Sequence, residues 1–211
     1  MQLFWNRLRT TAELIAHRSV VHSPRLDAER IEKALRSAPE WLTPRCVAGY
    51  DKGDFAFLAE VEQDELEKHV EEFRRIAWEI HPNVSPTEEQ IERALPSLIA
   101  IVEMLEFDRY GDLDAYQIGK RIEREIEPER PSTLAELRFE TGWDNTGDPS
   151  LWIWAVLTDK AAGKKDFATN TRTIRELLTS AARTVDAKHW PYVRFRTVSE
   201  QVELQLLGAS A

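Results

Sequence analysis

The feature of the sequence that most constrains the fold is a pair of alternating segments in the second half of the chain, residues 135–140 and 151–157. Side chains of two kinds alternate along each segment, and a period of two is typical of a β-strand whose two faces differ. Residues 142–149, GWDNTGDP, separate the segments with turn formers that neither a strand nor a helix tolerates. The sequence therefore predicts an antiparallel hairpin with a loop longer than a two-residue turn.

A helix and a further strand are predicted to complete the unit that contains this hairpin. Apolar residues recur at helical spacings over residues 169–187, and alternation returns over residues 192–199. Residues 202–206 also alternate, which predicts a short fourth strand. The rear of the chain is therefore predicted as a ββαβ unit with a three- to four-stranded sheet.

The front of the chain is predicted to be helical. Apolar residues at spacings of three and four mark five helices, over residues 2–17, 26–35, 59–80, 85–105 and 112–125. Ser85 is predicted as the N-cap of the fourth helix because Pro86 and Glu88 follow it at the spacing of a capping box.

The fold class is therefore predicted to be α+β. Pro128 and Pro131 favour a linker between the helices and the hairpin. We place a helical domain at residues 1–128 and an α/β domain with the antiparallel hairpin at residues 129–211. The fifth helix lies close enough in sequence to pack with the sheet.

Charge is distributed unevenly between the two parts. The formal net charge is −9; residues 1–130 hold 27 acidic and 18 basic side chains, whereas residues 131–211 hold 10 of each. An acidic surface repels phosphate backbones, so binding of nucleic acid by the front is disfavoured. Arginine outnumbers lysine by 20 to 8, a bias typical of a GC-rich bacterial genome.

The composition predicts a soluble protein of the cytoplasm. Hydrophobic residues at 42% and charged residues at 31% are ordinary for a globular domain. No apolar run reaches the roughly 18–20 residues that span a bilayer, and the first residues lack the pattern of a signal peptide. Cys46 is the only cysteine, which excludes an internal disulfide framework and a thiolate zinc site. No membrane partner is therefore expected.

The two faces of the predicted sheet differ sharply in chemistry. One is apolar and suits a covering helix; it consists of Leu137, Phe139, Ile153, Ala155, Val193 and Phe195. The other is aromatic and charged; it consists of Glu136, Arg138, Glu140, Trp152, Trp154, Tyr192, Arg194 and Arg196. Trp, Tyr and Arg are the residue types of interaction hot spots and of stacking platforms for bases.

The candidate partner-binding residues on this second face are Arg138, Trp152, Trp154, Tyr192, Arg194 and Arg196. Three interpretations stay open at this point. The face is covered by the N-terminal helices with Glu–Arg pairs across strands, it binds a protein partner, or it binds a nucleotide or nucleic acid.

The chain offers few residues for metal or cofactor chemistry. Asp144 and Asp148, with Glu140 nearby, could form a carboxylate cluster for Mg²⁺, but acidic residues beside glycine and proline are usually turn formers. The histidines show no metal-ligand spacing, and no glycine-rich phosphate loop or nucleophile motif is present. We therefore expect no metal and no cofactor.

Arg75 and His81 stand six residues apart at the end of the helix predicted over residues 59–80, with Arg74 adjacent. This spacing resembles the Arg-x₄₋₆-His motif of HEPN-type ribonucleases. The resemblance implies metal-independent cleavage of RNA by Arg75 and His81 in paired helical domains. It covers one helix, and Ile76 stands where that family usually has a polar residue. The competing interpretation is a helix-terminal histidine favoured by the helix dipole beside a solvated arginine pair.

No convergent catalytic set emerges from these residues. The sequence therefore favours a non-enzymatic interaction protein: a subunit, adaptor or inhibitor, of the antitoxin or immunity type, in a bacterial multiprotein system. A protein partner is expected, and a basic one would suit the acidic front; association of copies stays open. The alternative is a HEPN-like ribonuclease that uses the pair Arg75 and His81.

Overall fold

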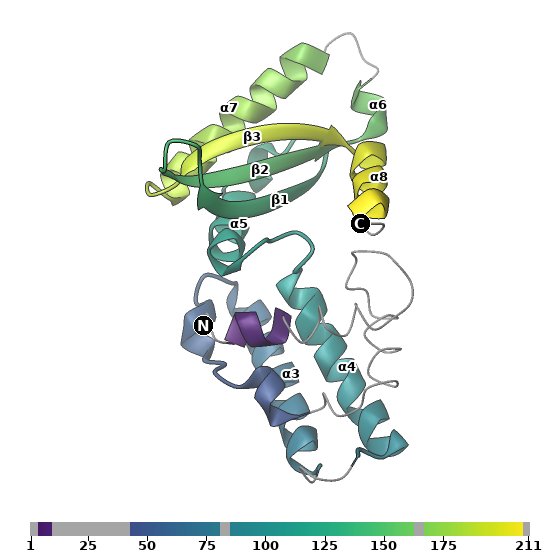
Figure 1. Cartoon of the computed structure of the whole chain (residues 1–211). Coiled ribbons are helices and arrows are strands. Elements are labelled where there is room, and N and C mark those ends of the chain that lie inside the picture. Colours follow the sequence, from purple (N-terminus) through teal and green to yellow (C-terminus); the bar gives the residue numbers. More distant parts are fainter. Residues whose placement is uncertain (1–3, 10–42, 81–84, 163–166, 209–211) are drawn as a thin grey trace. The chain divides into compact units, whose positions relative to one another are not determined.

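The computed structural model describes residues 4–9, 43–80, 85–162 and 167–208 (Figure 1). Helices and a three-stranded sheet make up an α+β fold, as predicted. The chain divides into two compact units, residues 1–107 and 108–211, which are described separately. Within the described ranges, no helix has the length and apolar character needed to cross a membrane. The helix predicted over residues 26–35 lies outside the described residues.

The first unit is built on two packed helices, α3 (Glu60–Trp78) and α4 (Glu88–Leu105), which follow the short 3-10 turns η2 (Pro44–Val47) and η3 (Lys52–Phe55). Residues 4–9 are helical, in agreement with the start of the helix predicted over residues 2–17; the rest of that segment is not described. The side chains of Phe4, Phe55 and Phe73 are fully buried in this unit, and Cys46 is buried as well. An aromatic and aliphatic core therefore holds the first unit together.

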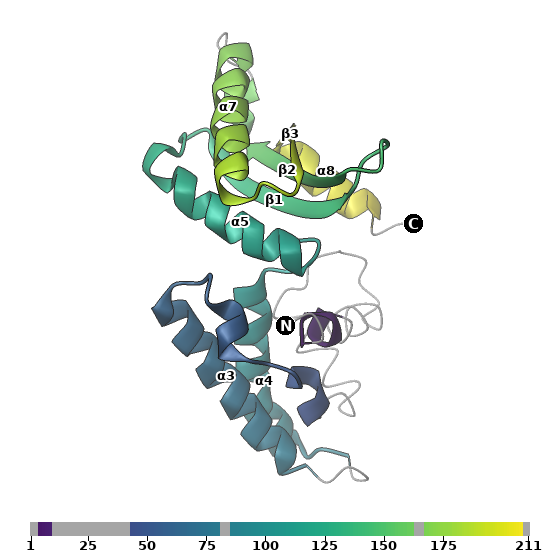
Figure 2. The same ribbon diagram turned by 90° about the vertical axis from the view of Figure 1, so that its left-hand side faces the viewer.

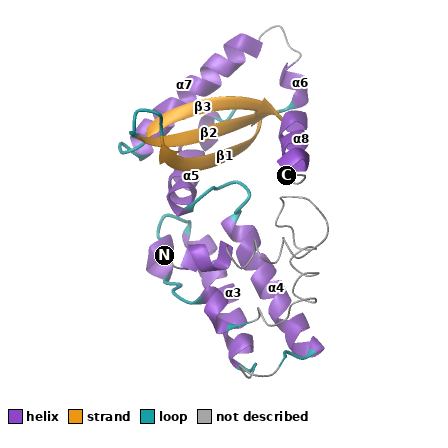
Figure 3. Cartoon of the chain, viewed as in Figure 1, coloured by secondary structure: helices purple, strands orange, loops and turns teal. Residues whose placement is uncertain are grey.

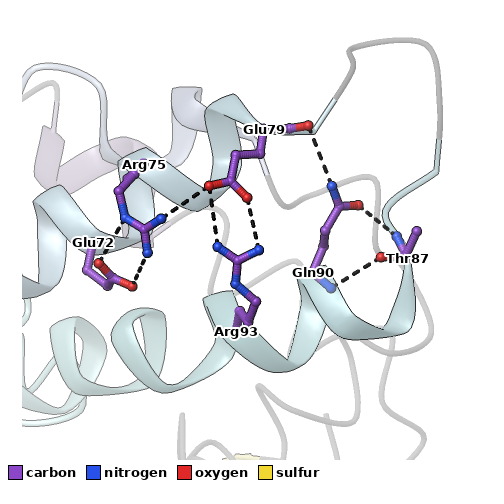
Figure 4. Close-up of polar contacts among 6 residues, drawn as sticks. All are labelled: Glu72, Arg75, Glu79, Thr87, Gln90 and Arg93. Atoms are coloured by element: carbon purple, nitrogen blue, oxygen red, sulfur yellow. Dashed lines mark hydrogen bonds and ion pairs between the residues drawn. The ribbon is translucent and has the colours of Figure 1, made fainter.

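The N-cap of α4 differs from the prediction. Thr87, rather than Ser85, caps the helix: its hydroxyl accepts from the Gln90 N–H at 3.3 Å, and the Gln90 side chain accepts from the Thr87 N–H at 2.9 Å (Figure 4). Glutamine completes a capping box as well as glutamate does, so a second box two residues further on competes with the predicted one. The spacing of residues in the sequence does not decide which of the two candidate capping boxes forms.

The second unit combines helices with the sheet. Its elements are α5 (Leu113–Ile126), η4 (Glu127–Glu129), β1 (Leu134–Trp143), β2 (Pro149–Leu157), α6 (Asp159–Ala162), α7 (Phe167–Val185), β3 (Trp190–Thr197) and α8 (Val198–Gly208). The strand order is β1-β2-β3; β1 and β2 pair antiparallel, and β2 and β3 pair parallel (Figure 3). Parallel neighbours need a crossover connection, which α7 supplies.

Helices α5 and α7 lie on the same side of the sheet (Figure 2). Beneath them Leu137, Phe139, Ile153 and Ala155 have no exposed surface. Gly119 lets α5 come close, because a Cβ at this position would lie 2.5 Å from the Tyr110 ring and 2.7 Å from the Phe139 ring. The predicted apolar face is therefore the one that the helices cover.

One detail of the second unit differs from expectation. Residues 202–206 belong to α8 and not to a fourth strand; Thr197 and Glu200 form a capping box that starts this helix directly after β3. The division into compact units falls after Phe107, and α5 belongs to the second unit because it packs on β1 and α7.

Candidate functional site

The register of the sheet brings the predicted aromatic and charged residues onto one face. Across the three strands, Glu140 pairs with Trp152 and Trp152 with Tyr192; in the next row Arg138 pairs with Trp154 and Trp154 with Arg194. We call Arg138, Trp152, Trp154, Tyr192, Arg194 and Arg196 the aromatic–arginine face. Apart from the exposed Arg194, its side chains are half-buried.

Trp154 lies at the centre of this face, and two guanidinium groups approach its ring. The Arg196 guanidinium carbon lies 3.4 Å from the ring centroid, and that of Arg194 lies 5.2 Å from it. Contacts of this kind stabilise by about 0.5–1 kcal/mol each at exposed sites. The indole therefore fixes the position of both arginines while leaving guanidinium N–H groups able to donate to a further group.

Trp152 lies next to Trp154 in the row above, against Tyr192. The two rings are nearly parallel, at an interplanar angle of 19° and a centroid distance of 6.1 Å. Gly142 of β1 makes room for the indole, because a Cβ there would lie 2.8 Å from its ring. The strand glycine is thus a positioning residue for Trp152.

The hairpin loop orients Tyr192 from the other side. Its hydroxyl donates to the Asp144 carboxylate at 2.8 Å. The same carboxylate accepts from the Thr146 hydroxyl and from the N–H groups of Thr146 and Asp148. These bonds, that from the Thr146 hydroxyl first, lower the pKa of Asp144, and the bond to Asp144 raises the pKa of Tyr192. Asp144 is therefore an ionised loop anchor whose oxygens are occupied by the protein itself.

Arg138 is neutralised within the fold. Its Nε lies 2.7 Å from the Glu136 carboxylate, an ion pair that is not aligned as a hydrogen bond, and its Nη1 donates to the Asp108 carbonyl oxygen at 2.9 Å. Its side chain is only 12% exposed. Arg138 therefore supports the face more than it offers charge to a partner.

Arg194 and Arg196 differ from Arg138 in this respect. Within the described part of the chain, no carboxylate forms an ion pair with either of them. Arg196 donates instead to the neutral Gln201 side chain of α8 at 3.2 Å. Burial, together with the charges of Arg138 and Arg194, lowers the pKa of Arg196. The nearby carboxylates of Glu140 and Glu200 act in the opposite direction. Within the described residues, Arg194 and Arg196 are therefore free of ion pairs, but their charge is partly balanced.

The chemistry of this face follows from the side chains that it presents. The aromatic–arginine face contains no histidine, cysteine or lysine, the side chains most often used for proton transfer or nucleophilic attack. Among the described residues, no group of three His, Cys, Asp or Glu side chains is placed to hold a metal ion. The chemistry available is stacking by the indoles and donation by guanidinium groups to carboxylate or phosphate oxygens.

The other predicted site residues, Arg75 and His81, are only partly described. Arg75 of α3 pairs with Glu72 at 2.7 Å and with Glu79 at 3.2 Å; Glu79 also binds Arg93 of α4 at 2.9 Å (Figure 4). His81 lies outside the described residues. The Arg75 guanidinium therefore takes part in an ion-pair network that joins α3 to α4.

Sequence reasoning missed the residues that arrange the face. Three residues each position one side chain of the face: Gly142, Asp144 and Gln201. Only Gly142 could have been recognised from the sequence, since a glycine inside a strand often marks a place where another group packs closely against the backbone. Asp144 accepts from Tyr192, and Gln201 accepts from Arg196. No local sequence pattern predicts either contact.

Comparisons of the chain with protein-family models, curated proteins and solved structures found no match.

Proposed function

We propose that this chain is a non-enzymatic interaction protein that binds a protein partner through the aromatic–arginine face, as a subunit, adaptor or inhibitor of a bacterial multiprotein system. The observation that supports this most is Trp154 with the guanidinium groups of Arg194 and Arg196 against its ring and no described carboxylate paired with either. Trp and Arg are among the residues that supply most binding energy at protein interfaces.

The chemistry of the face favours a partner that presents carboxylate groups beside apolar surface. A guanidinium group binds a carboxylate through two parallel hydrogen bonds, and the indoles exclude water from such a contact. A nucleic acid also has stacking surfaces and anions. The acidic excess that would repel its phosphate backbone lies in residues 1–130, whereas residues 131–211, which carry the face, hold 10 acidic and 10 basic side chains.

The test is isolation of the tagged chain from its native host. We expect a single protein to copurify at fixed stoichiometry, and Trp152→Ala or Arg194→Ala to abolish its recovery while the variants remain folded. Matched controls are Trp78→Ala on α3, where the side chain is 72% exposed, and Arg45→Ala, also at an exposed position. Both controls should retain the partner.

Two outcomes would argue against this function. Equal recovery of the partner by the face variants and the controls would exclude the aromatic–arginine face as the binding surface. Cleavage of RNA by the purified chain, lost on His81→Ala, would favour the ribonuclease alternative instead.

A further inference from the structure

The two edges of the sheet differ in how they are closed. On the outer side of β1, the Gly111 N–H donates to the Phe139 carbonyl oxygen and the Phe139 N–H donates to the Arg109 carbonyl oxygen, both at 2.8 Å. The segment before α5 therefore pairs with this edge. β3 is the other edge, and no described segment pairs with its outer side.

The open part of β3 can be located from its proline. In a parallel ladder, alternate residues direct both backbone groups to the neighbouring strand. Pro191 has no N–H and pairs in register with Leu151, so its neighbours Trp190 and Tyr192 must supply the bonds to β2. The N–H and C=O groups of Val193 and Phe195 consequently point away from β2. Among the described residues nothing bonds to them.

This open stretch has a limit at each end. Pro191 lacks a donor on the outer side, and the Thr197 N–H donates to the Glu200 carboxylate at 2.8 Å in the cap of α8. Between them, Val193 and Phe195 present two donors and two acceptors. Their side chains are half-buried, unlike Ile153 and Ala155 of β2 on the same face, which have no exposed surface. The cover of α7 therefore thins toward the edge.

Arginine side chains border this edge on both faces of the sheet. Arg194 and Arg196 lie on one face against Trp154. On the other face, the Arg175 guanidinium carbon of α7 lies 5.3 Å from the Phe195 ring centroid. Arg175 also lines a solvent-open hollow on α7, together with Glu176. At the α8 end of the edge, Phe195 and Arg196 line a second hollow with Glu200 and Glu203, so the basic border is confined to the part of β3 before α8. No described carboxylate forms an ion pair with any of these three arginines.

We infer that the outer edge of β3 accepts an extended, acidic segment of the partner protein as a fourth strand. This inference rests on the proposed function and names the binding mode. Added strands bind through main-chain hydrogen bonds, and their side chains alternate between the two faces of the sheet. Because arginines border both faces at β3, carboxylates at successive positions of the segment would meet guanidinium groups on each side.

A second copy of this chain suits the edge less well. Pairing of β3 with β3 of another copy would bring Arg194 and Arg196 of both copies onto one continuous face without a paired carboxylate, and like charges placed opposite each other destabilise a sheet. A nucleic acid would use the guanidinium groups but not the backbone groups of Val193 and Phe195. An acidic segment uses both.

The experiment uses the full chain and a short capped peptide of alternating Glu and Val residues as the probe. Nuclear magnetic resonance should show that the amides of Val193 and Phe195 shift and gain protection from exchange on addition of millimolar peptide. The same peptide with Lys for Glu should not bind, and neither should a version with N-methylated amides.

Three variants locate the interaction on the chain. Val193→Pro removes a donor that points away from β2, so the sheet should form and peptide binding should be lost. Arg175→Ala and Arg194→Ala, one on each face, should each weaken binding by about two- to fivefold, as expected for partly exposed ion pairs. Arg45→Ala in the first unit is the matched control and should bind as the wild type does.

Several results would overturn the strand addition. Absence of peptide binding, or binding of the N-methylated peptide, would exclude main-chain pairing at this edge. Tighter binding of single-stranded oligothymidylate would favour a nucleic acid. Exchange protection of the Val193 and Phe195 amides that rises with protein concentration in the free chain would favour a second copy. Failure of the proposed function is distinguishable from these. If Val193→Pro retains a natural partner that Trp152→Ala loses, the face binds that partner without strand addition.

Discussion

The two faces of the sheet use the same three strands for different purposes. Under α5 and α7, Phe139 and Ile153 are fully buried, and the Phe139 ring stacks against Tyr110. On the opposite face, Trp152 and Trp154 are half-buried and touch Tyr192 and guanidinium groups. The difference shows that one strand pattern can specify a buried apolar face and a half-buried aromatic and charged face together, because successive side chains point to opposite faces.

The comparison extends to what holds each side chain in place. In the covered face, position follows from close packing, as at Gly119, where a Cβ would collide with two rings. In the aromatic–arginine face, position follows from stacking and hydrogen bonds, as in the bond of Tyr192 to Asp144. Substitutions in the first face should therefore change stability, and those in the second should mainly change binding.

The largest effect is expected for Phe139→Ala. Removal of a fully buried phenylalanine leaves a cavity and lowers the free energy of unfolding by about 3–5 kcal/mol. Glu140→Ala, one residue on and on the other face, should change it by less than about 0.5 kcal/mol. Hydrogen exchange of Leu137 and Ile153 in urea reports on this unit alone. Similar effects of the two substitutions would contradict the assignment of faces.

Trp154→Ala should be less damaging than Phe139→Ala. The half-buried indole contributes its contacts with Arg194 and Arg196, so we expect a loss of about 1–2 kcal/mol in the same exchange measurement. The backbone amide signals of the covered face should stay at their wild-type positions. Unfolding of the whole sheet would show that the face is part of the core and not a surface.

Gly142→Ala tests the contact that positions Trp152. The new methyl group would lie 2.8 Å from the indole, which must move away from Tyr192, at a cost of less than about 1 kcal/mol because the ring is half-exposed. Near-ultraviolet circular dichroism should record the altered ring pair. In a Trp152→Ala background the same glycine substitution should cost nothing, since the clash is gone. A cost that persists there would assign the glycine a backbone role.

The smallest effect is expected for Asp144→Asn at neutral pH, and it should depend on pH. The folded chain lowers the pKa of Asp144 below its ordinary value near 4, so the carboxylate stabilises the fold above that value. This contribution is lost as pH falls through the folded pKa. The stability difference between wild type and Asp144→Asn should therefore shrink below about pH 4, as measured by urea unfolding at several pH values. A constant difference would contradict the lowered pKa.

Much of the fold could be predicted because it depends on local periodicity. The hairpin, the crossover helix and the third strand follow from spacings of two and of three to four, and the structure confirms them. The prediction of a strand over residues 202–206 was wrong because apolar residues in a short segment fit either period, and the cap formed by Thr197 and Glu200 decides for helix. The packing of α5 on β1 and α7 is a tertiary contact that periodicity does not encode.

The sequence by itself determined which side chains share a face, because alternation is a property of the extended backbone and holds wherever the strand is placed. Only the tertiary structure decided that β3 lies parallel to β2 at an open edge, with Arg194 and Arg196 against Trp154. Strand order and register depend on how the crossover helix buries its apolar side against the sheet, and that burial involves residues far apart in the chain.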